Sequence, residues 1–237
     1  MTADHWLLIS AAVLAAAFVQ GSTGVGFALI AGPVMGLIAP QLLPVSLLVL
    51  MLPLNLYVLW RERAAIDRHG ASWVTFGRVA GTAGGIWVLA MLSASQLALF
   101  VGLATVAAAL VTIAMPSFTP GRKVYAAAGV ITGITETATG IGGPPLALVY
   151  QHQPVAVMRA TIALCFLVGE LVSLAVLVAT DRVPEGQWQA LAALLPALGV
   201  GAWLSRHGAH RVNERFLRRF VLGFAIVSGM ALLVKAA

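Results

Sequence analysis

Eight apolar runs separated by short polar linkers dominate this sequence of 237 residues. Six of them have the length of about 17 to 25 residues with which an α-helix crosses about 30 Å of hydrocarbon. Because 60% of the residues are hydrophobic and only 9% are charged, we predict an all-α polytopic membrane protein in a lipid bilayer. The runs cover residues 5–39, 42–60, 73–92, 96–115, 124–150, 155–180, 187–205 and 216–234.

The basic residues lie in the linkers, where cytoplasmic loops of membrane proteins carry them, so the net charge of +6 does not indicate nucleic-acid binding. Cys165 is the one cysteine, which excludes a disulfide framework or a cysteine zinc site. We expect no metal and no cofactor. Sequence patterns for a phosphate-binding loop, a zinc protease or a serine hydrolase are absent, and we expect no enzyme.

The first and fifth runs differ from the others, because a short glycine-rich stretch interrupts each of them. These stretches are Thr23 to Gly26 and Thr139 to Gly142, 116 residues apart and so nearly half the chain. Glycine in a helix interior is unfavourable by about 1 kcal/mol relative to alanine, and prolines follow the second stretch. We therefore predict two pseudo-symmetric repeats, 1–117 and 118–237, each a broken, re-entrant helical hairpin followed by three transmembrane helices.

The basic linkers indicate how the repeats are oriented. If both broken runs return to the side they enter from, all four basic linkers face the cytoplasm, as the positive-inside rule requires. Each half then has three full crossings, so the two repeats are predicted to be inverted relative to one another. If all eight runs cross instead, two of the basic linkers face outside. The four linkers are represented by Arg63, Arg122, Arg159 and Arg211.

The glycine-rich turns are the candidate binding site. Unpaired backbone inside a membrane must line a cavity or be buried in protein, and amides at helix N-termini suit an anion. Arg78 and Arg159 could add charge, although snorkelling to the interface and a topogenic role are the alternatives. The candidate substrate-binding residues are Thr23, Gly24, Val25, Gly26, Thr139, Gly140, Ile141, Gly142, Gly143, Arg78 and Arg159.

For the other glycines and for the polar residues inside the runs, a role in the structure is an alternative to a role in binding or proton coupling. Glu136 and Glu170 are candidates for proton coupling, with a structural hydrogen bond as the alternative for each. Gln20 holds the position before Thr23 that Glu136 holds before Thr139, and Asn55 lies deep in the second run. For Asn55 an interhelical hydrogen bond is the favoured role. For the glycines at 81, 85, 199 and 201 we expect helix packing.

Three stretches resemble the TauE/SafE sulfite exporter family, also called the four-toluene-sulfonate uptake permease family. They are Gly21 to Pro33, Gly133 to Pro145 and the basic linker Arg206 to Arg219. The first copy lacks the Gly-Pro-Pro that ends the second, a departure from full symmetry.

The resemblance covers the whole chain. It implies a carrier in the bacterial plasma membrane that moves sulfite, sulfonates or related small anions. From it we expect secondary transport, with export favoured, by alternating access around the two broken helices. An anion channel and an intramembrane enzyme using Glu136 or Glu170 are the alternatives. A homodimer is left open.

Overall fold

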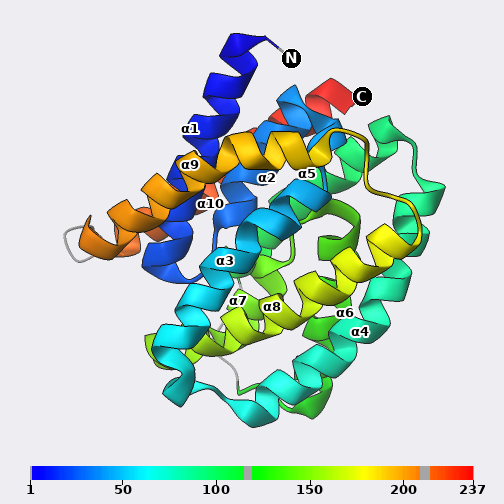
Figure 1. Cartoon of the computed structure of the whole chain (residues 1–237). Coiled ribbons are helices and arrows are strands. Elements are labelled where there is room, and N and C mark those ends of the chain that lie inside the picture. The colour runs from blue at the N-terminus through cyan, green and yellow to red at the C-terminus, as the bar shows by residue number, and fades with distance from the viewer. Residues whose placement is uncertain (1, 115–118, 209–213, 237) are drawn as a thin grey trace.

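The computed structural model describes residues 2–114, 119–208 and 214–236, and every regular element in them is helical (Figure 1). This confirms the all-α prediction. Arg211 lies outside the described residues. The first half contains α1 (Ala3–Thr23), α2 (Phe27–Ile38), η1 (Pro40–Leu42), α3 (Val45–Glu62), η2 (Arg63–Ala65), α4 (Arg68–Met91) and α5 (Ala94–Ala114). The second contains α6 (Arg122–Thr139), α7 (Gly143–Tyr150), α8 (Val155–Ala179), α9 (Gln187–Gly208) and α10 (Glu214–Ala236).

Five segments of the described chain are long and apolar enough to cross a membrane: α1, α3 with η2, α4, α8 and α9. Helix α2 and the central parts of α5 and α10 are shorter apolar stretches. Side chains facing outward are largely apolar too, including Trp60, Phe76 and Trp87. These lengths and surfaces are those of a multi-pass membrane protein.

The two halves of the chain interlock. Helix α4 of the first half lies along α6 of the second, and α9 of the second half lies along α1 of the first. Helices α3 and α8 pack on each other, as do α5 and α10. Exchanging the halves, α1 for α6 and so on to α5 for α10, turns each of these pairs into another or into itself. The packing therefore has an approximate two-fold relation.

Each broken run folds as a hairpin whose two ends lie together. In the first hairpin, Leu8 near the start of α1 and Ile38 at the end of α2 line one apolar groove. In the second, the rings of Tyr125 at the start of α6 and Tyr150 at the end of α7 are 5.4 Å apart. Each run thus turns back at its glycine-rich stretch.

The two hairpins enter the bundle from opposite ends. The base of the first is held by Gln187, whose Nε2 donates to the Leu42 carbonyl at 2.9 Å and to Ser46 Oγ at 2.7 Å. The base of the second is held by Asp67, which accepts from the Tyr150 hydroxyl at 3.4 Å. The α8–α9 linker therefore marks one end, and the η2–α4 linker marks the other.

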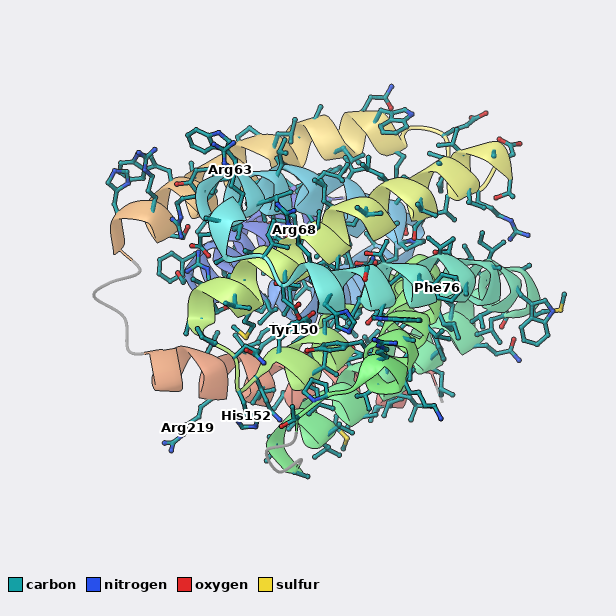
Figure 2. The ribbon with its side chains drawn as sticks, turned by 90° about the horizontal axis from the view of Figure 1, so that it is seen from below. Arg63, Arg68, Phe76, Tyr150, His152 and Arg219 are labelled. Carbon is teal, nitrogen blue, oxygen red and sulfur yellow. The ribbon has the colours of Figure 1, made fainter. Side chains whose placement is uncertain are left out.

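Three basic linkers meet at the Asp67 end. Arg159 Nε lies 3.5 Å from the Glu62 carboxylate, which joins the start of α8 to the end of α3. Arg122, at the start of α6, lies over the Trp73 ring near the start of α4. In Figure 2, Phe76 is labelled on the right, two turns along α4 from Arg68. The other labels lie on the left and in the centre: Arg63, Arg68, Tyr150, His152 and Arg219.

Glycines let α4 and α6 pack with their backbones in contact. A β-carbon added at Gly81 would overlap the Val130 carbonyl, and one at Gly85 would meet the Thr137 side chain and the Ile134 carbonyl. Gly201 packs in the same way on the Leu14 carbonyl of α1. The packing role expected for these three glycines is confirmed. For Gly199 it is wrong, because a β-carbon there would meet no atom within 4 Å.

Candidate functional site

The two glycine-rich turns have matching backbone geometry. Gly24 and Gly140 end α1 and α6 with positive φ angles of 84° and 80°. A residue with a β-carbon is strained at such angles, whereas glycine is not. Their amides donate to the carbonyls of Gln20 and Glu136 at 2.8 Å and 2.6 Å. The sequence equivalence of Gln20 and Glu136 thus corresponds to the same position in both turns.

The two threonines brace these turns from within. Thr23 Oγ1 donates to the Val19 carbonyl at 3.0 Å and accepts from the Val25 amide at 3.3 Å. Thr139 Oγ1 donates to the Thr135 carbonyl at 2.6 Å and accepts from the Ile141 amide at 3.1 Å. Both hydroxyl protons are donated inside the protein, so the threonines fix the shape of the turns. A direct contact between these hydroxyls and a substrate stays a prediction.

The helices that follow the turns differ in how their first amides are bonded. In the first hairpin, the Phe27 amide donates to Gln20 Oε1 at 3.1 Å. In the second, the Glu136 carboxylate forms an ion pair with Arg78 instead. Among the described residues, the amides of Gly142 and Gly143 have no hydrogen-bond acceptor. The N-terminus of α7 therefore presents free donors.

A cavity of about 230 Å³ is lined by residues of both hairpins. Residues of the first turn face residues at the start of α7 across it, and the α7–α8 linker adds two glutamines. Gln151 Nε2 is shielded from solvent and has no hydrogen-bond partner among the described residues. The lining residues are Thr23, Val25, Gly26, Leu29, Gly143, Pro144, Ala147, Gln151, Gln153, Val155, Met158, Val221 and Leu222. This lining contains donors and apolar groups but no carboxylate.

A buried polar cluster lies apart from this lining, and it contains all the intramembrane polar candidates. Asn55 Nδ2 donates to Glu170 Oε1 at 2.7 Å, and Gln20 Nε2 donates to Asn55 Oδ1 at 3.2 Å. Arg78 pairs with Glu136 and lies 5.2 Å from the centre of the Phe166 ring. Each of these five polar residues is at most 1% exposed, so none reaches solvent.

The two arginine candidates lie outside the cavity lining. Arg78 approaches α8 at Gly169, where a β-carbon would overlap its guanidinium group. Arg159 donates to the carbonyls of Ser22 at 3.2 Å and Gly21 at 3.0 Å. It therefore binds the C-terminus of α1, where a cation is favourable for the helix dipole. Contact between either arginine and a substrate stays a prediction.

The comparison with protein families matches residues 8–232 to the family described as sulfite exporter TauE/SafE. The chain belongs to this family. TauE/SafE proteins are membrane transporters, and the resemblance seen in the three motifs is confirmed over nearly the whole sequence. No curated protein and no solved structure gives a significant match.

Sequence reasoning did not assign several residues to the site that the structure brings there. Gln151 and Gln153 are seen in the sequence beside His152, at the exit of the second hairpin, but their place in the cavity lining was not predicted. Nothing in the sequence indicated a role for Glu62, because its partner Arg159 is remote in sequence. Nothing indicated one for Thr132 either, because its partner is a backbone carbonyl in the turn between α6 and α7. Thr132 Oγ1 donates to the Gly142 carbonyl at 3.2 Å and holds the α6–α7 turn.

Proposed function

We propose that this TauE/SafE protein is a secondary transporter that exports sulfite or a small organosulfonate across a bacterial plasma membrane. The anion binds between the two hairpin turns, and the protein contributes binding and movement but no chemistry. One observation carries the proposal: free amides at the start of α7, a shielded donor on Gln151 and the first turn all surround one cavity. Such dipoles can hold an anion without a paired cation.

The arrangement of the hairpins supports alternating access. They enter the bundle from opposite ends, and the helix pairs exchange with the halves of the chain. Inverted repeats of this kind let one half rock against the other around a fixed site. The proposed topology puts the Asp67 end, with its basic linkers, in the cytoplasm.

The cavity includes residues of the α7–α8 linker and therefore extends toward that end. The described conformation is, in this proposal, the one that loads the anion from inside.

Replacing Gly143 by proline, which removes one backbone N–H donor, tests the site directly. Gly143 is the first residue of α7, a position where proline is tolerated because the amide has no helical partner. Gly143→Pro deletes this amide, whereas Gly143→Ala keeps it. A β-carbon at this position meets only Phe166 Cζ, at 3.9 Å, so the alanine control overlaps no other side chain. Gly142, which precedes it, has φ −121° and ψ −5°, and as a glycine it is free to move toward the extended backbone that a following proline favours.

A hydrogen bond to a charged ligand contributes about 1.5 to 3 kcal/mol, so we expect Gly143→Pro to weaken sulfite affinity about tenfold to a hundredfold. Gly143→Ala should bind normally. Affinity is measured on purified protein beside thermal stability, and sulfite counterflow into proteoliposomes separates a carrier from a channel. Normal affinity in a folded Gly143→Pro protein would refute the site.

A further inference from the structure

Glu170 is a fully buried acid that lacks a full set of partners. Its Oε1 accepts from Asn55, but its Oε2 has no hydrogen-bond partner among the described residues. The charged groups nearby are Arg78 of α4 and, paired with it, Glu136 of α6, while α3 contributes only the neutral Asn55. Cys165 lies on the same helix. With both acids ionised, two carboxylates share one arginine in a buried cluster, which is unfavourable.

A line of amides connects Glu170 to the first hairpin. Asn55 Oδ1 accepts from Gln20 Nε2, and Gln20 Oε1 accepts from the Phe27 amide at the start of α2. Gln20 Nε2 also donates to the Gly24 carbonyl at 3.1 Å. Every side-chain amide has a donor end and an acceptor end, so the orientation of one fixes that of the next. The line ends beside Gly26, which borders the cavity.

We propose that Glu170 binds the coupling proton and that this amide relay transmits its protonation to the anion site. The inference rests on the proposed function and adds its coupling group. Ionised Glu170 can only accept, which sets Asn55 and then Gln20 in the observed orientation. When Glu170 takes up a proton from the aqueous phase on Oε1, the oxygen that faces Asn55, this acceptor becomes an O–H donor, and Asn55 turns its Oδ1 toward it. Gln20 reverses in response.

The reversal releases a donor to the anion. A reversed Gln20 presents Nε2 to the Phe27 amide, and two donors cannot bond to each other. The Phe27 amide and the Gly24 carbonyl then lose their hydrogen bonds to the Gln20 side chain, so the amide becomes available to an anion beside Gly26. Protonation also removes one negative charge from the cluster, which acts in the same direction. By linkage, proton and anion each strengthen the binding of the other.

Sulfite affinity of the purified full chain, measured at about pH 5.5 and at about pH 8, tests the relay. The ratio of variant to wild-type affinity cancels the change in sulfite's own charge. Glu170→Gln keeps a donor toward Asn55 and imitates the protonated acid. We expect it to bind like wild type at the acidic pH and about tenfold to a hundredfold more tightly at the alkaline pH, where one hydrogen-bond donor is gained.

Two further variants separate the relay from a structural role. Asn55→Leu breaks the line, so its affinity ratio to wild type should also change with pH. Ser173→Ala is the matched control, because Ser173 lies one turn from Glu170 and bonds Thr137 at 2.8 Å, outside the line. Its ratio should stay constant.

Constant ratios in both Glu170→Gln and Asn55→Leu overturn the relay while leaving the transporter intact. Absence of saturable sulfite binding by wild type at either pH overturns the proposed function itself.

Discussion

At the scale of single residues, the pairing of Arg78 with Glu136 sets the balance of the buried cluster. Removing the arginine leaves two carboxylates without a cation, and breaking a buried pair in this way typically costs about 3 to 5 kcal/mol. We expect Arg78→Met to lower the thermal stability of the purified protein strongly. Adding Glu136→Gln to that variant should recover part of the loss, since the unpaired charge is then gone. A wild-type melting temperature for Arg78→Met would contradict this pairing.

Gln151 offers the opposite case, a polar group whose removal should spare the fold. Its Nε2 makes no hydrogen bond within the described residues, so Gln151→Leu should leave thermal stability near that of wild type. If this donor binds the anion, sulfite affinity should fall about tenfold or more. His152→Leu is the control, because His152 is exposed and is not part of the lining. Equal affinity in the two variants would exclude Gln151 from the site.

The buried charged residues could be predicted from the sequence, but which of them pair with one another could not. Charged and polar residues inside apolar runs are rare enough to identify Arg78, Glu136 and Glu170 without a structure. Which of the acids pairs with the arginine depends on how α4, α6 and α8 rotate against one another. The sequence equivalence of Gln20 and Glu136 is real, yet only Gln20 caps the helix that follows, because the Glu136 carboxylate pairs with Arg78 instead.

At the scale of elements, the close approach of α4 and α6 makes a clear forecast. Gly81→Ala places a methyl group against the Val130 carbonyl, and overpacking of this kind costs about 1 to 3 kcal/mol. We expect a lower melting temperature with normal sulfite affinity in the protein that remains folded. Gly199→Ala has open space and should be neutral or stabilising, because alanine favours a helix more than glycine does. Equal losses in both variants would argue against a packed seam.

The sequence predicted these elements better than their contacts. Glycine-rich breaks at fixed places within long apolar runs were sufficient to expect two hairpins, since neither turn fits a straight helix. Glycine spacing alone could not tell a packed glycine from an open one. Gly199 and Gly201 are about 200° apart around α9 and so lie on nearly opposite faces, and only Gly201 faces α1. The direction in which a helix face points is set by the whole bundle.

At the scale of the whole molecule, the exchange of helix pairs and the opposite direction of the two hairpins are what a duplication with inversion would produce, and the inverted repeat stays a prediction. An inverted pair needs an odd number of crossings in each half, which re-entrant hairpins provide. With eight full crossings, each linker of the second half would lie on the side of the membrane opposite to the one that the re-entrant topology gives it. The α7–α8 and α8–α9 linkers therefore distinguish the two topologies, since α8 runs between them.

Single cysteines at His152 and Arg182, in a Cys165→Ala background, measure this directly. Both positions are exposed, and the 25 residues of α8 separate them by about 37 Å at 1.5 Å per residue, so they lie at opposite ends of one crossing. An impermeant thiol reagent added to intact cells should label Arg182→Cys and spare His152→Cys, because the basic linkers stay in the cytoplasm. Arg63→Cys, internal in both topologies, reports leakage of the reagent. Labelling of His152→Cys with protection of Arg182→Cys would establish eight simple crossings and remove the inverted arrangement on which alternating access around these hairpins depends.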